Sequence, residues 1–129
     1  MPWPVVYFRT VDGSEPVNDA IDQLPAKVQV IIDNQVARLG LFGPGLGFPY
    51  TSQIDGELRE LRCHAGDDHY RILYQRSRNL FVLLHFLAKR TATIPATDVA
   101  IAQARWRDFR RRIDERPRRP PRAVGHDAP

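Results

Sequence analysis

Three segments in the middle of the chain have the composition of β-strands, and the breaks between them are very short. The segments are "ELRELRC" (57–63), "HYRILYQ" (69–75) and "LFVLLHF" (80–86). Neighbouring parallel strands need a crossover of about a dozen residues or more, which the breaks "HAGDD" and "RSRN" cannot supply. The spacing therefore predicts antiparallel hairpins. The third segment is apolar on both faces, which predicts a central position in the sheet.

The first two of these segments alternate between apolar and polar residues, so each presents two different faces. In the second segment, one face carries Tyr70, Ile72 and Tyr74, and the other carries Arg71, Leu73 and Gln75. In the first segment, Leu58, Glu60 and Arg62 lie opposite Arg59, Leu61 and Cys63. Both segments therefore place arginine on a surface that is only partly apolar.

The remaining elements come from propensity and from helical spacing of apolar residues. "VVYFRT" (5–10) predicts a strand, and Ser14 is a possible N-cap for a short helix that follows. Pro25 is expected to open a second helix that Gly40 ends. The segment "LFGPGLGFPY" (41–50) predicts a loop. Thr97 is expected to cap a last helix, whose apolar stripe is Val99, Ala102, Trp106, Phe109 and Ile113.

This order predicts an α+β fold of the form β-α-α-β-β-β-α, with helices packed on one face of a small, mainly antiparallel sheet. A length of 129 residues fits one domain, which we place at 1–115. The segment 116–129, "RPRRPPRAVGHDAP", is rich in arginine and proline and is expected to be a disordered tail. Its arginines could contact a polyanion or could have no role.

Composition excludes several classes of protein. The longest apolar run is far shorter than the roughly 18 residues of a membrane span, and no signal peptide is evident. We expect a cytoplasmic protein with no membrane partner. The single cysteine, Cys63, excludes an internal disulfide. Neither the cysteine nor the four histidines have the spacing of a zinc site, so no metal or cofactor is expected.

Charge is unevenly distributed along the chain. Residues 1–58 hold three basic and seven acidic residues, whereas residues 59–90 hold seven basic and three acidic ones. Residues 105–122 hold nine arginines and three acidic residues. The last two regions are therefore where a polyanion would bind, and arginine suits bidentate contacts to phosphate. Ordinary solubilising charge is the alternative interpretation.

Cations from separate strands can meet at one edge of the predicted sheet. They are Arg59 or Arg62, then Arg71, then Lys89 and Arg90 directly after the apolar strand. Such a cluster suits cleavage of RNA, in which a 2′-hydroxyl attacks the neighbouring phosphorus and cations stabilise the charge that develops. The alternative is that each arginine is simply solvated.

The roles of the neighbouring polar residues stay open. Glu60 could pair with Arg62, with Arg71 or with neither. His85 ends an apolar strand, so it is either a hydrogen-bonded core residue or part of the site. His64 and His69 lie near a hairpin turn and could transfer protons. Tyr70 and Tyr74 either pack in the core or stack on a base.

The segment from "DGELRELRC" to "AQAR" resembles the RelE/HigB toxins of bacterial toxin–antitoxin pairs, and within them the branch that includes phage-derived proteins. The matching features are an "LxELR" strand, a "YRxxY" strand, an apolar strand ending in His and Phe, a basic pair with Thr, and a Pro and an acidic residue before "AR". Here they are Leu58–Arg62, Tyr70–Tyr74, His85–Phe86, Lys89–Thr91, Pro95, Asp98 and Ala104–Arg105. The resemblance covers about residues 3–112.

The resemblance implies an mRNA endonuclease (an mRNA interferase) that acts on the ribosome and inhibits translation. It also implies neutralisation by a cognate antitoxin, often a helix-turn-helix protein. Basic strand residues act in such toxins, and by position this role carries over to Arg62, Arg71 and Arg90. Together with the predicted cluster of cations, this gives Arg62, Arg71, Lys89 and Arg90 as candidate catalytic residues. Arg59, Glu60 and His85 are the candidate substrate-binding residues. The segment "TATIPATD" lacks the tyrosine that some of these enzymes use, which leaves the general acid and base open. The alternatives are a ParE-like toxin that binds DNA gyrase without catalysis, or an inactive phage-derived relic.

Overall fold

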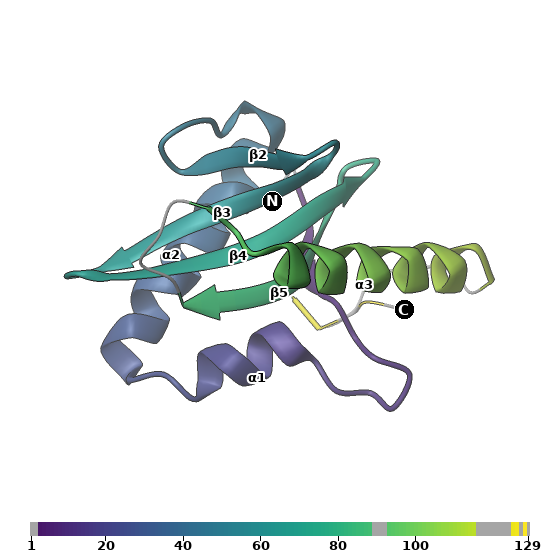
Figure 1. Ribbon diagram of the computed structural model, residues 1–129, viewed down its shortest axis with the longest axis horizontal. Helices are drawn as coiled ribbons and strands as arrows, with labels where there is room; N and C mark the ends of the chain where they lie inside the picture. Colours follow the sequence, from purple (N-terminus) through teal and green to yellow (C-terminus); the bar gives the residue numbers. More distant parts are fainter. Residues whose placement is uncertain (1–2, 89–92, 116–124, 127, 129) are drawn as a thin grey trace.

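The computed structural model describes residues 3–88, 93–115, 125, 126 and 128. The elements follow in chain order: β1 (Val5–Tyr7), α1 (Pro16–Asp22), α2 (Ala26–Phe42), the short 3-10 helix η1 (Gly43–Gly45), β2 (Thr51–Asp55), β3 (Leu58–Ala65), β4 (Asp68–Ser77), β5 (Leu80–Ala88) and α3 (Ala96–Glu115). Figure 1 shows the sheet with α3 in front of it.

The described strands form one sheet in the order β1-β5-β4-β3-β2. The pairs β2–β3, β3–β4 and β4–β5 are antiparallel, and β1 pairs with β5 in parallel. The predicted hairpins and the α+β class are therefore confirmed. β5 lies between β1 and β4, which confirms that the strand with two apolar faces is an inner one.

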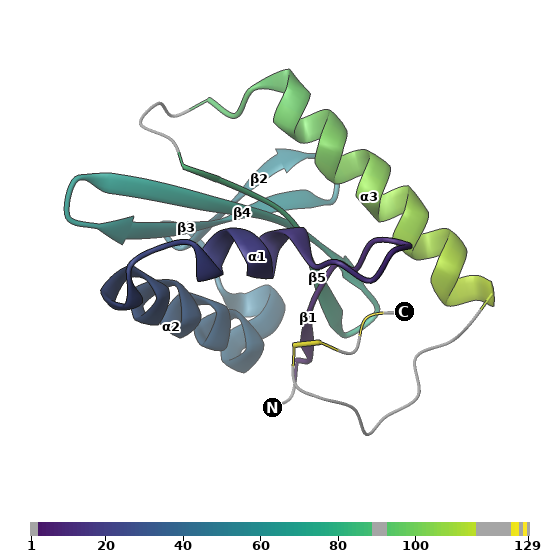
Figure 2. The same cartoon turned by 90° about the horizontal axis from the view of Figure 1, so that it is seen from below.

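The helices lie on both faces of the sheet, so the prediction that they share one face is wrong. Leu61 and Ile72 pack in one core with Ile32 and Leu39 of α2, together with residues of α1. Leu73 packs on the other side in a second core with α3. Figure 2 shows the sheet between α3 on one side and α1 and α2 on the other. The sequence shows that a helix is amphipathic but does not show which face of the sheet its stripe covers.

The apolar stripe predicted for the last helix is confirmed. Ala102 and Phe109 are fully buried against the sheet, and Val99, Trp106 and Ile113 pack around the same core. Steps of three and four residues keep these side chains on one side of the helix. Arg107, Arg110 and Arg111 are exposed on the other side of the helix, whereas Arg105 and Arg112 are half-buried.

Several predicted boundaries are wrong, and one strand was not predicted. β2, "TSQID", has a polar composition and lies at the edge of the sheet, where one strand neighbour is enough. α2 continues through Gly40 and ends at Phe42, and it is capped by Gly43, whose φ of 57° suits glycine at a helix end. The N-cap of α1 is Glu15, so the prediction of Ser14 is wrong. α3 begins at Ala96, so Thr97 lies inside this helix and does not cap it.

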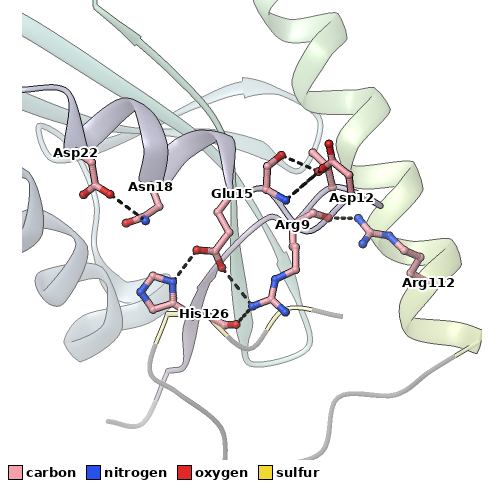
Figure 3. A network of polar contacts seen from close by, with 9 residues as sticks. Arg9, Asp12, Glu15, Asn18, Asp22, Arg112 and His126 are labelled. Carbon is pink, nitrogen blue, oxygen red and sulfur yellow. Dashed lines mark hydrogen bonds and ion pairs between the residues drawn. The ribbon is translucent and has the colours of Figure 1, made fainter.

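Part of the predicted tail contacts the edge of the sheet. The backbone N–H of Tyr7 donates to the carbonyl of Gly125 at 2.8 Å, and Ala128 is buried. Figure 3 shows Glu15 accepting from Arg9, and His126 Nδ1 lies 2.6 Å from the same carboxylate. These three C-terminal residues therefore contact the domain, while residues 116–124 lie outside the described part of the chain.

None of the helices described combines the length and hydropathy that a membrane span requires.

Cys63 is a natural probe of the core between the sheet and α2. It is 1% exposed, and burial raises the pKa of its thiol to about 12. Because the thiolate is the reactive form, we expect the native protein to react with a disulfide reagent at pH 8 at least about 100-fold more slowly than the urea-unfolded chain. Equal reaction rates of Cys63 in the native and the unfolded protein would contradict the buried position of this residue on β3.

Candidate functional site

Arg62 and Arg71 are directly paired across β3 and β4. Directly paired residues of antiparallel strands point to the same face, with Cβ atoms about 5 Å apart. The next pair toward the hairpin turn is His64 with His69, whose ring centroids are 4.7 Å apart. Two arginines and two histidines therefore follow one another on the face that α3 covers further along the sheet. Figure 1 shows the β3–β4 turn extending away from α3.

Arg71 forms a buried ion pair with Glu60. Its Nη1 donates to Oε1 of Glu60 at 2.5 Å, and the two residues are only 5% and 4% exposed. The hydroxyl of Ser52 on β2 donates to the other carboxylate oxygen at 2.5 Å. Glu60 thus pairs with Arg71, which decides between the alternatives left open by the sequence. The carboxylate also neutralises the charge of Arg71, so this arginine is fixed in place and is not a freely available cation.

Arg62 is half-buried and lies beside the loop that precedes β2. Its guanidinium carbon is 5.4 Å from the centre of the Phe48 ring, and Phe48 is itself exposed. The Arg62 backbone N–H donates to the carbonyl of Tyr50 at 2.8 Å, which fixes the start of β2 against β3. Among the described residues, Arg62 forms no ion pair, which makes it the cation of this face that is best able to receive a phosphate.

Arg59 does not join this group. It pairs with Tyr74 on the opposite face of the sheet, and its Nη2 donates to the hydroxyl of Thr51 at 3.1 Å. The sequence interpretation allowed Arg59 or Arg62 to meet Arg71, and the alternation of side chains selects Arg62. A role of Arg59 beside Arg62 in binding the same phosphate is therefore not compatible with its position.

His85 connects β5 to α3 on the same face as Arg71. Its Nε2 lies 2.7 Å from Oδ1 of Asp98, and its Nδ1 lies 3.3 Å from a guanidinium nitrogen of Arg105. Arg105 also donates to the carbonyl of Leu84 at 2.9 Å, and burial lowers the pKa of its guanidinium. An arginine can only donate, so Nδ1 accepts and the proton of a neutral ring sits on Nε2, facing Asp98.

Both ring nitrogens of His85 are therefore occupied, and this histidine holds α3 against the sheet. The sequence did not predict that Asp98 and Arg105 would be its partners. The available signal was that the two residues are seven apart in a helix, which places them on the same side two turns apart. Nothing local in the sequence indicates that His85 lies beneath them.

This role predicts a measurable loss of stability. Asp98→Ala removes a half-buried acceptor and leaves the Nε2–H of His85 without its partner. We expect the free energy of unfolding to fall by about 1 kcal/mol in urea titrations. Asp114→Ala, an exposed change in the same helix, is the matched control and should alter stability by less than about 0.5 kcal/mol. Equal effects of the two changes would contradict the His85–Asp98 contact.

Lys89 and Arg90 lie outside the described residues. They directly follow Ala88, which pairs with Tyr70 next to the Arg62–Arg71 pair. Tyr70 is 8% exposed and stacks on Phe86, and Tyr74 is 2% exposed in the core of the α2 side. Both tyrosines are therefore packing residues.

Comparison with protein families gives one match. The model of the family described as phage-derived protein Gp49-like (DUF891) matches residues 19–107, which is more than half of the chain. A comparison with curated proteins finds no match. The matched segment contains β2 to β5 and the first half of α3, and so includes the paired arginines and histidines described above.

Proposed function

The chain belongs to the Gp49-like family of phage-derived proteins, a family associated with toxin–antitoxin systems, and on this basis we propose that it is a toxin that cleaves mRNA on the ribosome. The observation that supports the proposal best is the direct pairing of Arg62 with Arg71 at the end of the sheet beyond α3. Glu60 neutralises Arg71, so the guanidinium of Arg62, which forms no ion pair within the described residues, is the group of this pair that an anion would bind.

The proposed chemistry needs a cation for the phosphate and groups that transfer protons. Arg62 would contact the phosphodiester, and Arg71, fixed by Glu60, would set the shape of the site. Lys89 and Arg90 would supply further positive charge from the end of β5. Preorganised cations stabilise the charge that builds on the phosphoryl oxygens when the 2′-hydroxyl attacks.

His64 and His69 are well placed for the proton transfers. They follow Arg62 and Arg71 on the same face, and His64 is exposed. An imidazole ring can either accept or donate a proton, so one ring can accept the 2′-hydroxyl proton while the other donates to the leaving oxygen. His85, with both nitrogens occupied, would position α3 and not exchange protons with the substrate.

A toxin of this kind requires a neutralising partner. We propose a cognate antitoxin as that partner and mRNA held by the ribosome as the substrate, in the cytoplasm of a bacterial cell.

Expression without the antitoxin separates the possible functions. We expect growth arrest, with translated messages cut and chromosomal DNA intact. Sequencing of RNA 5′ ends and an assay of the DNA-damage response measure the two effects in the same culture. Arrest with intact messages and a strong damage response would instead indicate a gyrase-directed toxin. Unhindered growth with the protein present in soluble form would indicate an inactive relic.

A further inference from the structure

A hollow of about 580 Å³ lies on the α2 side of the sheet, near the turn between β4 and β5. Tyr74 and Phe81 form part of its floor and are almost fully buried. Gly47 and Gly56 lie on its rim, and open space surrounds both of them. The hollow is on the opposite face from the Arg62–Arg71 pair, so the proposed cleavage reaction does not use it.

The lining is cationic above an apolar floor. Arg59, Arg76 and Arg78 line the hollow, against a single carboxylate from Glu57. Arg76 lies 5.2 Å from the centre of the Trp3 ring and donates to the carbonyl of Arg78. Two of the three guanidinium groups are thus held in place, because Arg59 also bonds to Thr51. Prearranged arginines lose less conformational freedom on binding a carboxylate or phosphate.

The combination of charge and floor distinguishes between possible occupants. A nucleic-acid backbone needs a row of cations along its length, and its bases cannot stack flat on Tyr74 and Phe81, because both rings are almost fully buried. A small inorganic anion would leave the floor unused. A peptide that carries carboxylates around one apolar side chain complements both parts, and the bare glycine rim lets its backbone approach closely.

We propose that this hollow docks an acidic segment of a partner protein, with an apolar side chain over Tyr74 and Phe81 and carboxylates on Arg76 and Arg78. The identity of that partner as the antitoxin rests on the proposed function. Docking here leaves the face of Arg62 and Arg71 uncovered. This segment therefore anchors the partner to the toxin and does not itself block the RNA site.

The two tryptophans of the chain provide a test, because they lie on opposite faces. Trp3 packs on the α2 side beside Arg76, and Trp106 of α3 packs against the core on the other face of the sheet. The probe is a short synthetic peptide of glutamate and leucine, added to the full-length ¹⁵N-labelled protein up to about 1 mM. We expect a saturable shift of the Trp3 indole N–H signal and no shift of the Trp106 signal. The same peptide with glutamine in place of glutamate should not bind.

Charge-reversal variants test whether Arg76 and Arg78 bind the peptide. Arg76→Glu with Arg78→Glu should weaken binding at least about tenfold, while Arg107→Glu on the exposed side of α3 should leave it unchanged. Absence of a Trp3 shift, equal shifts of both indoles, or wild-type binding by the double variant would overturn the proposal. Tighter binding of oligouridylate than of the peptide at Trp3 would also overturn it and indicate a nucleic-acid site. The titration requires no RNA cleavage, so its failure leaves the proposed function standing, and an inactive enzyme can still bind the peptide.

Discussion

Arg71→Ala is expected to lower the free energy of unfolding by about 3–5 kcal/mol, because it leaves the Glu60 carboxylate buried without its ion-pair partner. Arg71 and Glu60 are each about 95% buried, and the distance between the two charged groups is 2.5 Å. Ser52 alone cannot compensate a buried negative charge. Urea unfolding followed by tryptophan fluorescence measures the loss.

Two controls separate the ion pair from simple loss of packing. Replacing both partners together, Arg71→Met with Glu60→Leu, removes both charges and should restore most of the stability. Arg62→Ala, which removes a half-buried cation that forms no ion pair within the described residues, should cost less than about 1 kcal/mol. If Arg71→Ala is as stable as Arg62→Ala, the buried pair does not exist in solution.

The second large effect concerns activity. Arg62→Ala is expected to reduce cleavage of ribosome-bound mRNA at least about 100-fold, because one preorganised cation contributes several kcal/mol to stabilising the charged transition state. Single-turnover cleavage rates measured with purified ribosomes would quantify the loss. The folded state should persist, since the Arg62 side chain contacts mainly the exposed Phe48 ring.

The matched control is Arg59→Ala. Arg59 is three residues from Arg62 on the same strand, and its side chain lies on the opposite face of the sheet. Its cleavage rate should stay within about threefold of the wild-type rate. Arg62→Lys tests the geometry of the contact, because lysine keeps the charge and loses the planar fork, so an intermediate rate is expected. Equal losses for Arg59→Ala and Arg62→Ala would place the reaction elsewhere.

The sequence was sufficient to predict the hairpins, because short breaks leave no room for a crossover. Alternation also assigned the side chains of β3 and β4 to their correct faces. That assignment is why the pairing of Arg62 with Arg71, and the exclusion of Arg59, follow from the pattern once the strand register is known. β2 was missed because an edge strand needs neither apolar faces nor β-branched residues throughout.

Local sequence patterns did not predict the contacts between segments that are far apart in the chain. Whether Glu60 pairs with Arg62 or Arg71 depends on burial of a few side chains, and the pairing of His85 with Asp98 depends on where α3 crosses the sheet. The side of the sheet that α3 covers is also a tertiary property. The hollow lined by Arg76 and Arg78 was not foreseen either, because its floor and rim come from segments far apart in the chain.

The most direct measurement of the central claim is mapping of mRNA 5′ ends in a purified translation reaction that contains the wild-type protein or the Arg62→Ala variant. Our account predicts cuts within the reading frame that require ribosomes, appear with the wild-type protein and are nearly absent with the variant. Intact mRNA with wild-type protein, or identical cut patterns for both proteins, would contradict the assignment of the Arg62–Arg71 face as the site of RNA cleavage.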